Sequence, residues 1–104
     1  MKVVAYVPDL MDRSKVSAAA PGVMFVRTAE ELVDAAVDAD VVVIDLARPG
    51  VLDGIAELSG RGAARIVGFG SHVDRDLLDR ARAAGCHDVL PRSAFFSRMS
   101  ELLA

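Results

Sequence analysis

Residues 41–54 read VVVIDLARPGVLDG, and this stretch decides the fold. Its first four residues are all β-branched, and they lie between Asp40 and the turn sequence at 48–50. Such a run, too short for a helix, is typical of a strand buried on both faces in the centre of a parallel sheet. Asp45 follows where that strand should end. Ligands gather at the carboxyl ends of strands in open α/β sheets, so Asp45 is the first candidate site residue. An Asx-type turn is the alternative role for its side chain.

Composition limits the class of protein. The chain has 104 residues, of which 53% are apolar, and this predicts one well-packed domain over residues 1–104. No apolar run reaches the length of about 18 residues that a membrane span needs, and the N-terminus has no signal-peptide pattern. A net charge of −3 without a basic stripe argues against nucleic-acid and anionic membrane partners. The single cysteine fits a reducing compartment, so we expect a cytoplasmic protein.

Strands and helices alternate along the whole sequence. The pattern predicts strands at 2–7, 23–27, 41–44, 65–69 and 88–90, with helices at 10–20, 51–59, 73–84, from Thr28 and from Ser93. Strict alternation implies a parallel sheet with helices on both faces. For a chain this short, the expected fold is a doubly wound α/β sheet of flavodoxin-like order 2-1-3-4-5 with five helices.

Local signals set the expected ends of the helices. Thr28 with Glu31 forms a capping-box pattern, and Leu32, Val33, Ala36 and Val37 then repeat on one helical face. Gly60 and Gly85 should follow the ends of the third and fourth helices, and Ser93 should cap the last. On the outer face of helix 73–84, the spacing predicts the ion pairs Arg75–Asp79 and Asp76–Arg80.

Two motifs carry a family resemblance. The segment 45–54, DLARPGVLDG, resembles the part of bacterial response-regulator receiver domains that begins with the phosphorylated aspartate and has a proline four residues later. The segment 83–92, AAGCHDVLPR, is similar to the receiver stretch that ends in a functional lysine. The resemblance covers the whole chain. It implies a CheY-like fold and a role in two-component signal transduction, with a histidine kinase or an effector protein as partner.

Receiver chemistry requires more than the acceptor aspartate. Two acidic residues after the first strand hold a divalent cation, and a Ser or Thr and a Lys bind the phosphoryl oxygens. Here the acidic pair falls on Val7 and Pro8, and only a one-residue shift brings Asp9 into it. The Ser/Thr position falls on Gly70, with Ser71 beside it, and the Lys position on Arg92, whose planar fork differs from an ammonium.

These departures favour a divergent pseudo-receiver. We expect a signalling module that works by protein–protein interaction, without efficient phosphorylation, cofactor or enzymatic activity, and with Arg92 forming a salt bridge to Asp45. The chain ends with its last helix, so no effector domain is expected. The alternative is a phosphorylatable receiver with Asp45 as acceptor, Asp9 and Asp45 as weak Mg²⁺ ligands, and Arg92 with Ser71 on the phosphate.

A third hypothesis belongs to another class. In it, the chain is a small anion- or nucleotide-binding protein whose site is a helix start at Gly70–His72. Backbone N–H groups at a helix N-terminus bind anions. No nucleophile-elbow pattern surrounds Ser71, which argues against a hydrolytic set with His72 and Asp45. Cys86 and His87 are a poor metal ligand set, because zinc usually takes four ligands. Cys86 is expected in the core and His87 on the surface.

Phe95 and Phe96 are the candidate interaction surface. Neighbouring positions on one helix cannot both face inward, so one of the two rings should be exposed unless the helix is tilted or the second ring lies against the loop at Pro91. In receiver domains the surface of the fourth helix, fifth strand and fifth helix mediates dimerisation or output contacts. The resemblance therefore points to a protein partner or a homodimer at this face.

Overall fold

The computed structural model describes residues 1–62 and 64–103. In this part of the chain, five strands form one parallel sheet in the order β2-β1-β3-β4-β5. The strands are β1 (Val3–Tyr6), β2 (Met24–Phe25), β3 (Val41–Asp45), β4 (Arg65–Gly70) and β5 (Asp88–Pro91). The helices are α1 (Leu10–Ala19), α2 (Ala29–Ala35), α3 (Val51–Arg61), α4 (Arg75–Ala84) and α5 (Arg92–Leu102), with a 3-10 turn η1 (Ala36–Asp38) after α2. The predicted fold class, strand order and helix number are confirmed.

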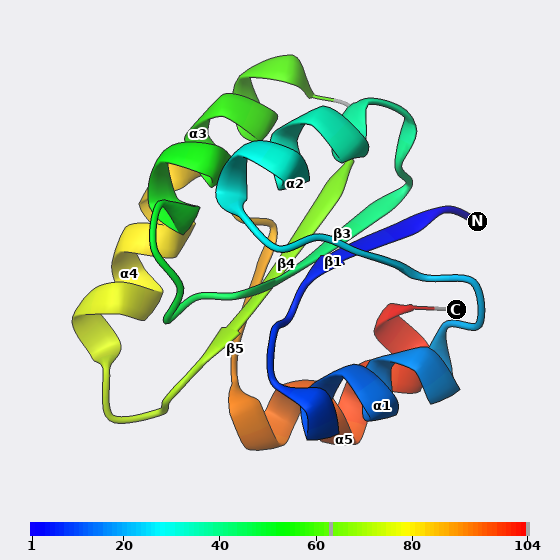
Figure 1. Cartoon of the computed structure of the whole chain (residues 1–104). Helices are drawn as coiled ribbons and strands as arrows, with labels where there is room; N and C mark the ends of the chain where they lie inside the picture. The colour runs from blue at the N-terminus through cyan, green and yellow to red at the C-terminus, as the bar shows by residue number, and fades with distance from the viewer. Residues whose placement is uncertain (63, 104) are drawn as a thin grey trace.

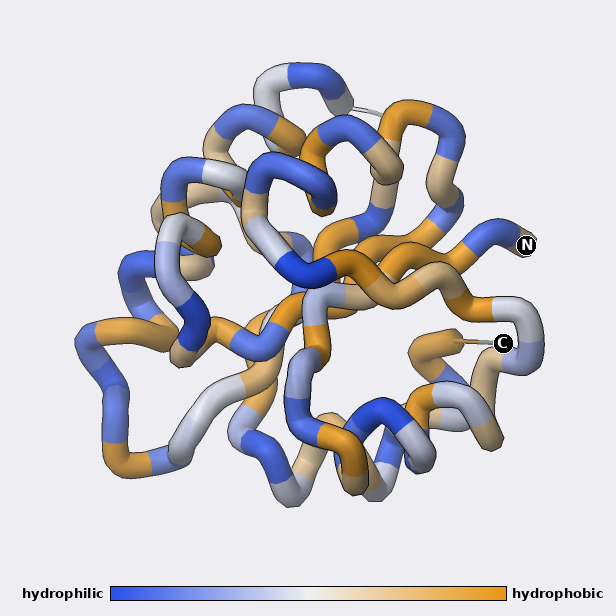
Figure 2. The backbone as a smooth tube through the Cα atoms, in the orientation of Figure 1, coloured by the Kyte–Doolittle hydropathy of each residue, from blue (hydrophilic) through white to orange (hydrophobic). Residues whose placement is uncertain are grey.

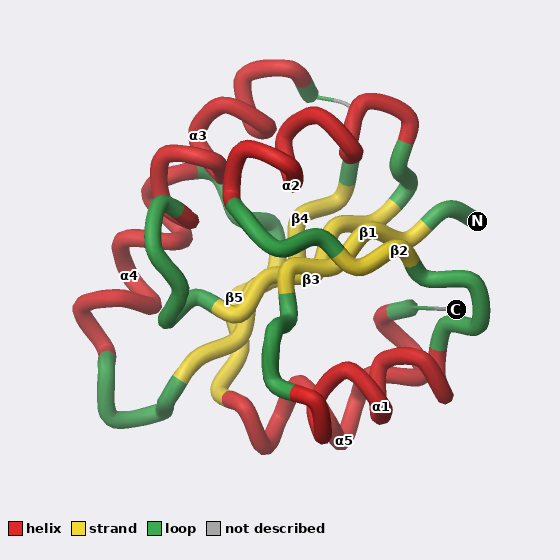
Figure 3. Tube along the Cα trace, viewed as in Figure 1, coloured by secondary structure: helices red, strands yellow, loops and turns green. Residues whose placement is uncertain are grey.

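Helices cover both faces of the sheet (Figures 1 and 3). α1 and α5 lie on one face, where Val16, Phe95 and Met99 pack against the sheet. α2, α3 and α4 lie on the other face, where Leu32 and Ile55 belong to the core. The strands in the middle are hydrophobic along most of their length, as the hydropathy colouring shows (Figure 2). Every residue of β3 is buried, as its β-branched run predicts.

Helix ends follow the predicted caps at several positions. The Thr28 hydroxyl accepts a hydrogen bond from the Glu31 N–H at 3.1 Å, and the Glu31 carboxylate reaches back to the Arg27 N–H at 2.9 Å. This is the expected capping box, displaced by one residue on the return bond. Gly85 ends α4 in the left-handed conformation, with a φ of 117°.

Several predictions about the helices are wrong. α3 continues through Gly60 to Arg61 and ends at Gly62, whose φ of 68° provides the left-handed cap. α5 begins at Arg92, directly after Pro91, so Ser93 is not its cap. Val37 is 65% exposed, because the chain leaves the α-helix at Ala35 and the 3-10 turn rotates this side chain outward.

The outer face of α4 carries the predicted kind of ion pair. Asp76 and Arg80 pair at 3.1 Å, as expected. Asp79 pairs with Arg82 at 2.9 Å, three residues later, and the predicted pair with Arg75 is not formed.

Within the described residues, no helix combines the length and the apolar character needed to cross a membrane.

Candidate functional site

The carboxyl ends of four strands meet at one edge of the sheet and bring the predicted site residues together. β1 leads to Asp9, β3 ends at Asp45, β4 ends at Gly70, and β5 leads directly into Arg92. Because the strands are parallel and adjacent, these ends lie at the same edge. We call this region the carboxyl edge.

Asp12 is the residue that sequence reasoning missed at this edge. It lies in the first turn of α1 and is only 3% exposed. Both of its carboxylate oxygens accept hydrogen bonds from Arg92 Nη2, at 2.7 and 2.9 Å. A signal for it exists in the sequence: Asp12 precedes the buried Val16 by one helical turn and therefore shares its inner face.

Arg92 therefore pairs with Asp12, and the predicted salt bridge from Arg92 to Asp45 is wrong. The two side chains come from positions 80 residues apart, and the packing of α1 against α5 brings them together. The hydrogen bond to Asp12 is the main cause that raises the pKa of Arg92 above its usual value, with further contributions from the charges of Asp12, Asp45 and Asp9. Arg92 is thus a fixed cation at all relevant pH values.

Aromatic rings also hold Arg92 in place. Its guanidinium carbon lies 5.3 Å from the centre of the Phe69 ring and 5.5 Å from that of Phe96. Contacts of this kind attract a cation to the ring face and are worth about 0.5–1 kcal/mol at exposed sites. The arginine fills a position between α1, β4 and α5 that its planar group suits better than an ammonium would.

Asp45 has partners of its own. Its carboxylate accepts a hydrogen bond from the Ala47 N–H at 3.1 Å and one from Arg48 Nε at 3.3 Å, and the residue is 5% exposed. The bond to the residue two positions later is the Asx-type turn that the sequence left open as an alternative role. Asp45 therefore sits at the expected edge, but its carboxylate is used locally.

Asp9 acts as a helix cap. Its side chain accepts a hydrogen bond from the Asp12 N–H at 3.0 Å and satisfies a free donor at the start of α1. That backbone bond is the main cause that lowers the pKa of Asp9, and the charges of Arg92 and Arg48 act in the same direction.

Residues 70–72, the expected anion site, do not lie at the start of a helix. α4 begins at Arg75 and is capped by Asp74, so Ser71 and His72 lie in an exposed turn before it. Gly70 is buried in β4, and a Cβ there would lie 3.3 Å from Leu78 Cδ2. Ser71 Oγ accepts a long hydrogen bond of 3.4 Å from the Val73 N–H. The hydroxyl is therefore tied into the turn.

The carboxylates of the edge do not fit a divalent cation. Mg²⁺ takes oxygen ligands in octahedral geometry. Asp9 caps a helix, Asp12 is bound by Arg92, and Asp45 is bound by Arg48. Across residues 1–62 and 64–103, no three His, Cys, Asp or Glu side chains converge on one point.

The two neighbouring phenylalanines have different environments. Phe95 is fully buried and stacks on Phe69, with ring centres 4.8 Å apart. Phe96 is half-buried, lies edge-on to both rings, and has the Lys15 ammonium 5.0 Å from its centre. Phe95 is therefore not available to a partner, and only Phe96 is left of the predicted surface. Both rings stay partly or wholly inside because they pack as one cluster with Phe69.

Cys86 and His87 have structural roles. Cys86 is 8% exposed, and burial raises the pKa of its thiol to about 12. His87 is exposed, and its Nδ1 accepts a hydrogen bond from the Ile66 N–H at 2.9 Å. A thiol with so high a pKa is a poor nucleophile and a poor metal ligand near neutral pH.

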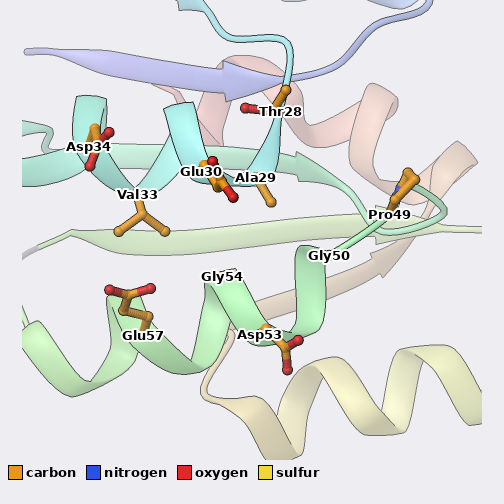
Figure 4. Close-up of a pocket in the computed structure, with 10 residues that line it drawn as sticks. All are labelled: Thr28, Ala29, Glu30, Val33, Asp34, Pro49, Gly50, Asp53, Gly54 and Glu57. Atoms are coloured by element: carbon orange, nitrogen blue, oxygen red, sulfur yellow. The ribbon is translucent and has the colours of Figure 1, made fainter.

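A second concave surface lies between α2 and α3 (Figure 4). We call it the α2–α3 groove. Its floor contains the small or apolar residues Ala29, Val33, Gly50 and Gly54, and its walls carry the carboxylates of Glu30, Asp34, Asp53 and Glu57. Glu57 pairs with Arg61 at 3.1 Å. In the part of the chain that the structure describes, the other three carboxylates form no ion pair.

Comparison with known proteins shows the fold. No protein-family model and no curated protein matches the sequence. Among solved structures, a response regulator from Hahella chejuensis superposes with a TM-score of 0.83 at 17% identity, covering 98% of this chain and 91% of that one. A response regulator from Thermotoga maritima gives 0.76 at 16% identity, covering 98% and 96%. The response regulator domain of Thermotoga maritima CheB gives 0.73 at 15% identity, covering 97% and 88%. The chain therefore has the fold of response-regulator receiver domains.

Proposed function

We propose that this chain is a receiver-like signalling module that acts through contacts with other proteins and does not accept a phosphoryl group efficiently. The observation that carries the proposal is the Asp12–Arg92 pair. Phosphoryl acceptance in a receiver needs a cation that can turn to the incoming phosphoryl oxygens. Here that cation, Arg92, is bound by a buried carboxylate of the chain itself, with both contacts under 3 Å.

The remaining positions of the carboxyl edge support the same reading. Gly70 carries no hydroxyl at the place where receivers have a Ser or Thr, and Ser71 beside it is bonded within its turn. Asp9, the remnant of the acidic pair, is engaged as a helix cap. The scaffold of the fold is thus kept, while each group that would handle a phosphate has another partner. A module of this kind signals through its surface shape, without catalysing a reaction.

The proposed partners are proteins of a signalling pathway, such as a histidine kinase, an effector protein or a second copy of the chain. Leu10 and Met11, in the first turn of α1, are 76% and 72% exposed. Phe96 is half-buried on the same side of the sheet, beside Lys15. Together they supply apolar surface at the α1–α5 side of the molecule. Light scattering from the purified chain distinguishes a homodimer from a monomer that needs another protein.

Thermal unfolding with and without Mg²⁺ and beryllofluoride, a mimic of the phosphoryl group, tests the proposal. A ligand at a hundredfold excess over its Kd stabilises a protein by about 2.7 kcal/mol. For a domain of this size, each kcal/mol moves Tm by roughly 4–8 °C, so real binding is easily seen. We expect no shift for the wild type or for Asp45→Asn.

The Asp45→Asn variant is the matched control, because it removes the acceptor charge and keeps the size of the side chain. A shift in the wild type that disappears in Asp45→Asn would overturn the proposal and make the domain a working phosphoryl switch. A shift in both would reveal anion binding elsewhere in the molecule, and would support the anion-binding hypothesis in place of the signalling one.

A further inference from the structure

We propose that Asp12 is the permanent anionic partner of Arg92, and that it holds the α1–α5 side of the carboxyl edge in one conformation in which no phosphoryl group is needed. The inference rests on the proposed function, because it says what fixes the state of the module. The receiver-like motifs at 45–54 and 83–92 do not include Asp12. Its role follows from its burial, its contacts and its place between two helices.

The burial of the two partners is unequal, and this keeps the pair closed. The side chain of Asp12 is 4% exposed, while that of Arg92 is 45% exposed. Arg92 can be hydrated if the pair opens, but Asp12 cannot. A buried carboxylate that loses its cation is strongly destabilising, because the desolvated charge is left without compensation. The closed pair is therefore the stable state of the wild-type chain.

The pair joins two helices that the sheet alone does not connect directly. Asp12 lies in the first turn of α1, and Arg92 is the first residue of α5. Pro91, the residue before α5, provides no side-chain cap. A carboxylate near a helix N-terminus is favourable because it opposes the positive end of the helix dipole. Asp12 has this position in α1, and its hydrogen bonds to Arg92 link it to the first residue of α5.

The aromatic cluster is tied to the same contact. Arg92 lies over the rings of Phe69 and Phe96, and Phe69 stacks on Phe95. A change in the position of Arg92 would therefore reach β4 and the outer surface of α5. With Asp12 buried and bound to Arg92, the arginine stays on these rings, and the surface around Phe96 has one form.

The Asp12→Asn variant tests this role of Asp12. Asp12→Asn keeps the size of the side chain and removes its charge, so Arg92 loses its anion and becomes available to one from solution. Inorganic phosphate, titrated without Mg²⁺ and followed by the backbone amide resonances of residues 92–96, is the probe. We expect saturable binding to Asp12→Asn, with a Kd lower than that of the wild type by a factor of about ten or more, which corresponds to 1.4 kcal/mol or more. The double variant Asp12→Asn/Arg92→Met should lose it.

Asp9→Asn is the matched control. It removes one negative charge from the same edge and retains a residue that caps helices well. Asp9 contacts the backbone of Asp12 and makes no hydrogen bond to Arg92 among the described residues. Phosphate binding to Asp12→Asn that does not exceed binding to Asp9→Asn would overturn the inference, because the effect would then be one of net charge.

A measurement on the wild type needs no substitution and covers the case in which a variant fails to fold. The Nη resonances of Arg92 should be separate and its N–H protons slow to exchange, because Nη2 is held by Asp12. Arg98, which lies 3.8 Å from Glu101 and has a side chain 51% exposed, provides the reference. Averaged, fast-exchanging resonances for Arg92 like those of Arg98 would exclude a permanent pair. Both readouts are independent of beryllofluoride, so their failure is distinct from failure of the proposed function.

Discussion

The carboxyl edge and the α2–α3 groove treat charge in opposite ways. At the edge, the buried carboxylates of Asp12 and Asp45 each have an arginine partner. In the groove, α2 carries Glu30 and Asp34 four residues apart, and α3 carries Asp53 and Glu57 four residues apart. Like charges at this spacing repel on a helix. In the groove, solvent hydrates and screens these charges. At the edge, a buried charge without a partner would unfold a marginally stable domain.

The difference lies in how easily the charged groups of each region can exchange partners. A functional cation or carboxylate has to exchange partners during its reaction, and burial makes each exchange costly. At the edge, the charged groups are paired with each other and stabilise the fold. The groove has charged groups that cost a little stability and are still accessible. The following variants test this contrast, beginning with the largest effect.

Arg92→Met breaks the pair and leaves Asp12 without its cation. The methionine keeps an apolar stem over Phe69 and Phe96, so the lost interaction is mainly electrostatic. We expect a loss of roughly 3 kcal/mol in the free energy of unfolding, near the lower limit for broken buried pairs because Arg92 is half exposed. Urea unfolding measures it. Arg98→Met, which removes an exposed cation, should cost no more than about 0.5 kcal/mol. Equal losses would remove the distinction between buried and exposed charge.

Alanine at two glycines tests how closely each region is packed. At Gly68, beneath the edge, a Cβ would lie 2.8 Å from Leu46 Cδ2 and 3.2 Å from Cys86 Sγ. Leu46 is 1% exposed and has little room to move, so we expect Gly68→Ala to cost about 1 kcal/mol or more. At Gly54, in the groove, the nearest atoms are 3.8 Å away, so Gly54→Ala should gain about 0.5–1 kcal/mol from helix propensity. Effects of the same sign in thermal melts would contradict this contrast.

Asp34→Asn should stabilise the protein slightly. It relieves the repulsion with Glu30, and Asp34 lies near the C-terminus of α2, where a negative charge opposes the helix dipole. The expected gain is about 0.2–0.5 kcal/mol in low salt, and it should shrink as salt screens the charges. Glu57→Gln is the control, since it relieves a similar repulsion but loses the pair with Arg61. A gain for Glu57→Gln as large as that for Asp34→Asn would show that the ion pair is irrelevant.

The smallest expected effect concerns how the free energy of unfolding changes at acid pH. The folded chain lowers the pKa of Asp9 from its ordinary value of 3.8, mainly through the bond from the Asp12 N–H. This contribution is present above the unfolded pKa and is lost as the pH falls through the lower folded pKa. Asp9→Asn keeps a cap that does not titrate, so its stability should fall less steeply below about pH 4 than that of the wild type. Parallel curves from urea unfolding at several pH values would exclude this role.

Much of the architecture could be predicted from local patterns. The β-branched run at 41–44, the capping box at Thr28 and the glycine at 85 each specify an element or its end by chemistry within a few residues. The strand order follows because alternating strands and helices allow few right-handed topologies. The predicted end of α3 before Gly60 and the predicted cap of α5 at Ser93 were wrong, because α3 continues to the left-handed Gly62 and α5 begins directly after Pro91.

By itself, the sequence determined the fold, the edge of the sheet at which both Asp45 and Arg92 lie, and the absence of a hydroxyl at Gly70. Only the tertiary structure decided which charges pair. The charges of Asp12, Asp45 and Asp9 all act on Arg92, but its hydrogen bonds go to Asp12, 80 residues away in the chain. Asp45 pairs with Arg48, three residues later. Asp12 lies on the inner face of α1 and pairs with Arg92. Periodicity gives the face on which a residue lies, but the partner of a buried charge is set by packing between elements.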